Sequence, residues 1–98
     1  MKFFPLHVHS HYSLLDGLSK PKDIANRCVE LGLEGSALTD HGTISGAVSF
    51  VNAMNNKGKK PILGCEFYIC KEKPEEKQER KLSHLVVLAK NIEGWRSL

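Results

Sequence analysis

Residues 35–42 read Gly35-Ser36-Ala37-Leu38-Thr39-Asp40-His41-Gly42. The first half is small or apolar, as in a short strand buried on both faces, and the second half is a polar tip. A helix is predicted next and is closed by Gly58, with an apolar stripe at Ile44, Ala47, Val48, Val51 and Met54. A buried strand that stops at a polar tip and leads into a helix is typical of α/β folds.

The same unit precedes this stretch. Residues 4–9 are mostly apolar and predict a short buried strand. Ser19 is then expected to cap a helix with Pro21 in its first turn, because serine oxygens commonly accept from the first free backbone N–H groups. The helical spacing runs to Leu31, and Gly32 suits the position just past the end.

Two more strands are predicted after the second helix, over residues 61–70 and 84–89. Between them, residues 71–81 are nearly all charged and of mixed sign, which indicates a solvated loop. Asn91 is expected to cap a last helix. Strands that alternate with helices predict an α/β fold with about four parallel strands and intervening helices.

Composition excludes several classes of protein. The 98 residues suffice for one small domain, their formal charge is only +3, and no apolar run reaches the roughly 20 residues that a membrane helix needs. The mild charge gives no independent case for nucleic-acid binding. Cys28, Cys65 and Cys70 form no C-x-x-C pair, so we expect buried, reduced thiols and a cytoplasmic location.

Polar side chains gather where the predicted strands end or begin. Because ligands bind at the carboxyl ends of parallel strands, the first groups should share one rim, whereas Glu66 and His84 require bends or bulges to reach it. The candidate residues are His7, His9, Asp40, His41, Glu66 and His84.

His7 and His9 are two residues apart, so on a strand they project from the same face at about 6–7 Å and can share an ion. Imidazole and carboxylate ligands together suit zinc, manganese or iron, and several such ligands suit a multinuclear centre that holds a phosphate and activates a water. Asp16 is either a further ligand or a turn-forming residue before Gly17. His11 is expected to be a loop residue or to lie behind the ligands.

Three stretches resemble the polymerase and histidinol phosphatase (PHP) superfamily: His7-Val8-His9-Ser10, Thr39-Asp40-His41-Gly42 and Gly64-Cys65-Glu66-Phe67-Tyr68. The longer contexts 7–17, 60–68 and 84–95 are similar to the PHP domain at the N-terminus of bacterial DNA polymerase III alpha subunits. Apart from the charged loop, the resemblance covers essentially the whole chain.

The resemblance implies a distorted (β/α)7 barrel with up to three divalent ions. It implies metal ligands at His7, His9, Asp16, His41, Glu66 and His84. Catalytic roles are implied for His9, Asp40 and His41, with Asp40 orienting His41. The remaining ligands of the family would lie beyond Leu98, so residues 1–98 would be the N-terminal part of the domain. We expect this part alone to be inactive and to self-associate through its open sheet edge.

For the parent protein, the resemblance implies a DNA-directed DNA polymerase of DNA replication with a metal-dependent phosphoesterase or proofreading 3′–5′ exonuclease site. The implied partners are DNA, deoxynucleotides, a proofreading exonuclease subunit and a sliding clamp. No membrane partner is expected. Two alternatives stay open at this point. One is a free-standing phosphatase of the histidinol-phosphate type, and the other is a non-catalytic scaffold that binds a proofreading subunit.

Overall fold

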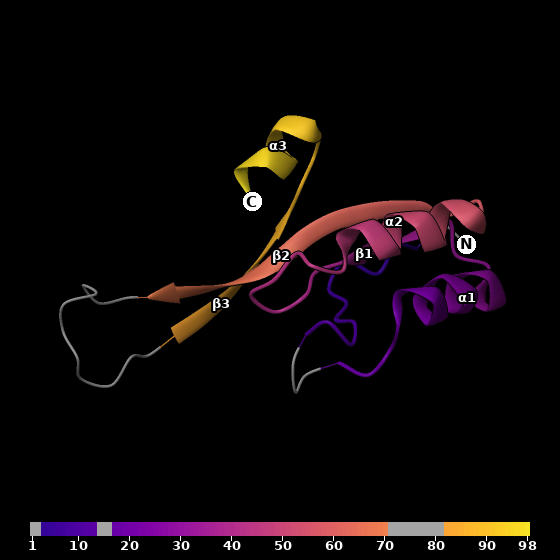
Figure 1. Ribbon diagram of the computed structural model, residues 1–98, viewed down its shortest axis with the longest axis horizontal. Coiled ribbons are helices and arrows are strands. Elements are labelled where there is room, and N and C mark those ends of the chain that lie inside the picture. The colour runs from indigo at the N-terminus through magenta and orange to yellow at the C-terminus, as the bar shows by residue number, and fades with distance from the viewer. Residues whose placement is uncertain (1–2, 14–16, 71–81) are drawn as a thin grey trace.

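The computed structural model describes residues 3–13, 17–70 and 82–98. The elements follow in the order α1 (Pro21–Leu31), β1 (Gly35–Leu38), α2 (Ala47–Asn56), β2 (Lys60–Cys70), β3 (Leu82–Leu88) and α3 (Ile92–Ser97). Figure 1 shows α1 and α2 side by side at one end, whereas the β2–β3 hairpin extends away from them and α3 stands apart. The mixture of helices and strands confirms the α/β class.

The sheet has the order β1-β2-β3. Strands β1 and β2 are parallel, with α2 between them in the chain, as predicted. Strand β3 is antiparallel to β2, with Tyr68 opposite His84, so the prediction of about four parallel strands is wrong. A parallel pair needs a crossover of a dozen or more residues, usually a helix, and the charged sequence 71–81 has no apolar stripe that could pack one on the sheet.

The predicted strand over residues 4–9 does not form as a regular strand. The segment nevertheless runs beside β1, because Ala37 N donates to Pro5 O and Thr39 N donates to Val8 O, each at 2.8 Å. Val8 N donates instead to the side-chain hydroxyl oxygen of Thr39, at 2.9 Å. Three residues on this segment therefore span two on β1, a bulge-like mismatch that breaks the regular ladder.

Helix α1 has the predicted bounds, and Gly32 follows it at φ 67°, in the left-handed conformation that favours glycine. The predicted cap at Ser19 is wrong, because the N-cap residue is Lys20. Its backbone N–H donates to the carboxylate of Asp23 at 3.2 Å. The hydrogen bond at this helix end is thus accepted by a carboxylate in the first turn and not by a serine before the helix. The predicted cap of α3 is confirmed, since the Asn91 side chain accepts from Gly94 N.

The core lies between α1, α2 and the sheet, and its buried members are Ile24, Ala25, Cys28, Leu33, Leu38, Phe50 and Met54. On α2 the buried face is Ala47, Phe50 and Met54, whereas Val48 is 73% exposed. The predicted stripe was therefore partly on the wrong face. Cys28 and Cys65 are free and buried, as expected.

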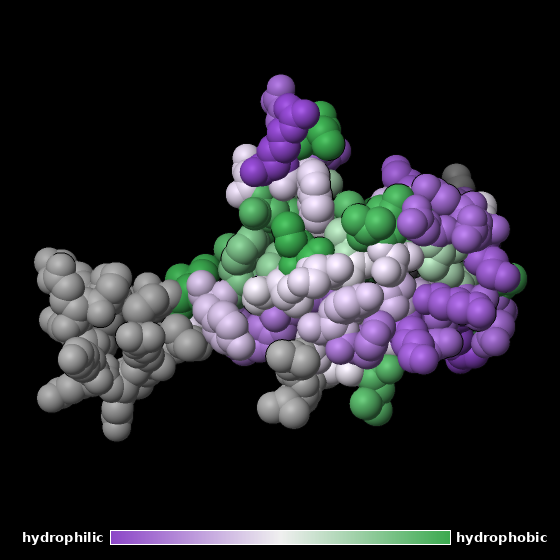
Figure 2. Space-filling view, viewed as in Figure 1, coloured by the Kyte–Doolittle hydropathy of each residue, from purple (hydrophilic) through white to green (hydrophobic). Residues whose placement is uncertain are grey.

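An apolar groove runs between α2, β2 and α3. Leu63 and Trp95 lie in it, with Val48 and Val51 of α2 on one side and Leu88 and Ile92 on the other. Figure 2 shows apolar surface at this place, below α3. No helix in the described part of the chain is long and apolar enough to span a bilayer.

Candidate metal centre

The first half of the site comes from the segment beside β1. His7 and His9 both turn their Nε2 atoms to Oε2 of Glu66, and for His9 the distance is 2.6 Å. The two rings lie edge to face with centroids 5.1 Å apart. These three ligand atoms lie within 4.8 Å of one another, so they could hold one ion. The predicted meeting of His7 and His9 on one face is confirmed, although the segment is not a regular strand.

The second half comes from the end of β1 and from the hairpin. His41 is bridged to Glu66 by backbone bonds on both sides: Glu66 N donates to Asp40 O at 3.0 Å, and Gly42 N donates to Glu66 O at 2.9 Å. His84 places Nδ1 3.1 Å from Oε1 of Glu66. The ligand atoms of His41, Glu66 and His84 form a second group within 4.8 Å.

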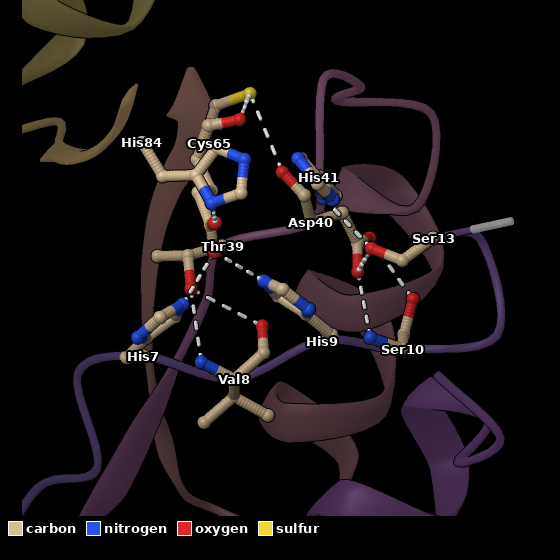
Figure 3. Close-up of polar contacts among 11 residues, drawn as sticks. His7, Val8, His9, Ser10, Ser13, Thr39, Asp40, His41, Cys65 and His84 are labelled. Atoms are coloured by element: carbon tan, nitrogen blue, oxygen red, sulfur yellow. Dashed lines mark hydrogen bonds and ion pairs between the residues drawn. The ribbon is translucent and has the colours of Figure 1, made fainter. Parts of the chain in front are cut away.

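Glu66 belongs to both groups, with one carboxylate oxygen toward each half. Its side chain is only 5% exposed, whereas those of His7 and His84 are 59% and 50% exposed. The site is therefore anchored on a buried carboxylate and opens to solvent along two imidazoles. Figure 3 shows His7, His9, His41 and His84 arranged around this centre from separate parts of the chain.

The antiparallel hairpin explains how His84 reaches the site. Because β3 runs back along β2, the start of β3 lies near the carboxyl end of β2, where Tyr68 pairs with His84. Glu66 and Tyr68 are two residues apart and face the same side of β2. With this antiparallel pairing, Glu66 and His84 reach the site without the bends or bulges that a parallel sheet would have required.

Burial alone would raise the pKa of the Glu66 carboxyl, but the hydrogen bonds and the electrostatic attraction of His7 and His9 outweigh burial and lower it. The carboxylate is therefore ionised, as a metal ligand must be. The imidazoles of His7 and His9 are the partners of this buried carboxylate and lie where a bound cation could replace them. Ionised carboxylate and imidazole donors in two groups fit divalent zinc, manganese or iron.

Cys65 precedes Glu66 but does not join the site. Burial raises the pKa of its thiol, so the neutral S–H persists, and it lies 3.4 Å from the backbone oxygen of Asp40. A thiolate is the form that binds metals. Cys65 therefore supports the strand from behind rather than offering a ligand.

Asp40 is almost fully buried and holds the loop that follows His9. Its carboxylate accepts from Ser10 N at 2.6 Å, from Ser10 Oγ at 2.9 Å and from Ser13 Oγ at 3.1 Å. Ser13 Oγ in turn accepts from His41 N at 2.7 Å. The link from Asp40 to His41 thus runs through a serine hydroxyl and the backbone (Figure 3).

The sequence interpretation missed this serine network. Ser10 and Ser13 are fully buried, although serines beside histidines in a polar loop look like surface residues. Tyr68, whose ring contacts His41 and His84, was also missed, and its position two residues after Glu66 was the available signal. Asp16 lies outside the described residues, and its predicted ligand role stays a prediction. His11 is exposed, packs on Tyr12 and belongs to neither group.

The sequence model of the PHP domain family matches residues 5–98. The chain belongs to the PHP domain family. This confirms the family resemblance drawn from the His7, Asp40 and Glu66 motifs.

Similar sequences are bacterial DNA polymerase III alpha subunits. Those of Chlamydia pneumoniae and Treponema pallidum (strain Nichols) are each 45% identical over 102 aligned positions, which cover 100% of this PHP chain. That of Helicobacter pylori (strain 26695) is 43% identical over 98% of the chain. The chain spans only 8%, 9% and 8% of these three relatives, respectively.

Two solved structures share the fold. A candidate metal-dependent phosphoesterase from Bifidobacterium adolescentis superposes with a TM-score of 0.72 and 24% identity, over 90% of this chain and 28% of that one. An amidohydrolase from Chromobacterium violaceum, solved with sulfate and without metal, gives a TM-score of 0.69 and 26% identity over 88% and 27%. Both likenesses support the PHP fold of the chain.

Proposed function

We propose that this chain provides a divalent-metal site for phosphodiester hydrolysis within a bacterial DNA polymerase III alpha subunit. The observation that carries the proposal is Glu66, a buried, ionised carboxylate shared by two groups of imidazoles. The match of the whole chain to polymerase alpha subunits supports the polymerase context over a free-standing phosphatase. The 98 residues would then be the N-terminal part of the PHP domain.

The residues fit a bound cation because each group offers imidazole nitrogen and carboxylate oxygen. His7 and His9 with Glu66 would hold one ion, and His41 and His84 with Glu66 would hold another. When bound, zinc, manganese or iron would supply charge to neutralise a phosphate and activate water for attack. The proposal also includes the predicted ligand role of Asp16 and the predicted (β/α)7 barrel of the complete domain.

The chain's own residues would orient the site. The Asp40–Ser10–Ser13 network is excluded from water and fixes the loop that follows His9. His7 and His84 are half-exposed, so a phosphate would approach along these two side chains. No hydrolytic nucleophile of the chain itself is required, because water is the attacking group in such a reaction.

In the polymerase, the substrate would be DNA, with proofreading 3′–5′ hydrolysis as the activity. Deoxynucleotides, a proofreading subunit and a sliding clamp would be partners of the parent protein rather than of these residues. A reducing, cytoplasmic location suits the free thiols Cys28 and Cys65.

The proposal is tested on the full-length protein by measuring metal content and release of nucleotides from single-stranded DNA. A His9→Ala variant purified in parallel separates the intrinsic activity from a contaminating nuclease. We expect bound zinc, manganese or iron and hydrolysis that the variant lacks. A protein without these metals, or equal hydrolysis by both proteins, would contradict the proposal.

A further inference from the structure

Tyr68 lies on the same face of the sheet as the metal centre. It is two residues after Glu66 on β2, so both side chains point to one side of the strand. Its partner on β3 is His84. Side chains directly opposite each other on antiparallel strands are neighbours on one face. Glu66, Tyr68 and His84 therefore form one continuous surface.

The Tyr68 ring packs against both imidazoles of the second group. Its centroid is 4.5 Å from that of His41, with 32° between the planes, and 5.3 Å from that of His84, at 72°. A Cβ added at Gly42 would lie 3.5 Å from the ring, so Tyr68 also covers the turn behind His41. These contacts fix the ring beside the His41–Glu66–His84 group.

Much of the ring remains open to solvent despite these contacts. Tyr68 is 52% exposed, and His84 beside it is half-exposed as well. The core lies on the side of α1 and α2, so burial of Tyr68 in that core does not explain its position. A fixed and open aromatic surface next to a phosphate-accepting centre is suited to a planar ligand group.

We propose that Tyr68 is a nucleobase subsite, on which a base of single-stranded DNA stacks while its phosphate lies at the His41–Glu66–His84 group. This inference rests on the proposed function. A cation held by the imidazole and carboxylate groups would contact the phosphate, whereas every nucleotide of DNA also presents a base. Stacking on an aromatic ring accepts any base and contributes about 1–3 kcal/mol, or about 5- to 150-fold in affinity.

A local probe is needed, because a full-length polymerase has other sites for DNA. The probe is a single-stranded oligodeoxynucleotide that carries 5-iodouracil near its 3′ end and phosphorothioate linkages that resist hydrolysis. It is photo-crosslinked to full-length protein loaded with Mn²⁺, and the crosslinked residue is located by mass spectrometry. We expect a crosslink at Tyr68, lost on chelation with EDTA.

The variants distinguish the ring from its hydroxyl and from the metal site. Tyr68→Phe keeps the ring and should keep the crosslink on β2, whereas Tyr68→Leu should lower its yield at least about fivefold with unchanged Mn²⁺ content. Tyr12→Leu is the control, because Tyr12 packs on His11, outside both ligand groups. Its crosslink should equal that of the unmodified protein.

Three results would overturn the subsite: no crosslink to β2, an equal β2 crosslink in Tyr68→Leu, or loss of Mn²⁺ from Tyr68→Leu. In the last case the ring acts by holding His41 and His84 rather than by contacting DNA. Hydrolysis of an ordinary oligodeoxynucleotide is measured separately with the unmodified protein. Absence of hydrolysis would contradict the proposed function, and the crosslink would still decide on Tyr68.

Discussion

The two halves of the metal centre share Glu66 but are built in different ways. His7 and His9 lie on an irregular segment that is hydrogen-bonded to β1 through its backbone. The buried Asp40–serine network holds the loop that follows this segment. His41 and His84 come from a turn and a strand whose register with β2 is fixed by the sheet itself. The first half thus depends on buried polar side chains, and the second depends on regular pairing.

This difference predicts which substitutions affect one half of the site and which affect both. A change at Glu66 should affect both halves, and a change at a histidine should affect one. A change in the Asp40 network should weaken the first half more than the second, which the network contacts through Ser13 Oγ and the backbone N–H of His41. The predictions below test this order, from the largest effect to the smallest.

Glu66→Gln removes the carboxylate that both groups of the described residues share, so both ions should be lost. Loss of an outer partner of a ligand costs about 10–100-fold in affinity, and loss of this shared ligand should exceed that. Metal content of purified full-length protein, measured by mass spectrometry of the elements, is the test. Glu34→Gln, at an exposed carboxylate, is the control and should keep its metal. Equal content in both variants would show that Glu66 holds no ion.

His9→Ala should abolish hydrolysis with little loss of fold, because His9 contributes a ligand and does not belong to the hydrophobic core. The rate should fall by at least about 100-fold, and the melting temperature should change little. His11→Ala is the matched control, since His11 is exposed and outside both groups. If the two variants hydrolyse DNA at the same rate, His9 is not part of the site.

His84→Ala should remove one ion and leave the first half occupied. Two Mn²⁺ ions that share a carboxylate give an exchange-coupled electron paramagnetic resonance spectrum, and one ion gives a mononuclear spectrum. The variant is expected to show the mononuclear spectrum and half the titrated Mn²⁺ of the parent at these two groups. A spectrum that stays coupled would place His84 outside the second group.

Asp40→Asn should have the smallest effect on metal and a measurable effect on stability. The carboxylate accepts three hydrogen bonds through its two oxygens, and an amide would replace one of these oxygens with an NH2 group that cannot accept. Unfolding free energy should fall by about 1–3 kcal/mol, and affinity for the first ion by about tenfold. Asp23→Asn, at the exposed cap of α1, is the control. A similar loss of affinity at both halves would mean that Asp40 does not act through the His9 loop.

The sequence predicted which side chains cluster better than it predicted the sheet. His7, His9 and His41 were expected at one rim, whereas Glu66 and His84 were expected to need bends or bulges to reach it. The structure brings all five together. The direction of β3 was missed because an apolar run such as Leu85-Val86-Val87-Leu88 is the same for parallel and antiparallel pairing. The bulge at Val8 was missed for a similar reason, since an extra residue between two hydrogen bonds does not change the pattern of apolar residues.

The supporting residues were harder to predict than the ligands. A histidine two residues from another has few roles, whereas Ser10 and Ser13 are common loop residues whose burial depends on where Asp40 lies in space. Tyr68 could have been found by extending the two-residue alternation of β2 from Glu66. Side chains that act through tertiary contacts carry little local signal.

The most direct test is the position of the ions themselves. Anomalous diffraction from crystals of Mn²⁺-loaded full-length protein should give two peaks that flank the carboxylate of Glu66, one beside His7 and His9 and the other beside His41 and His84. Peaks elsewhere, with the Glu66 carboxylate still paired only to imidazoles, would contradict the shared centre.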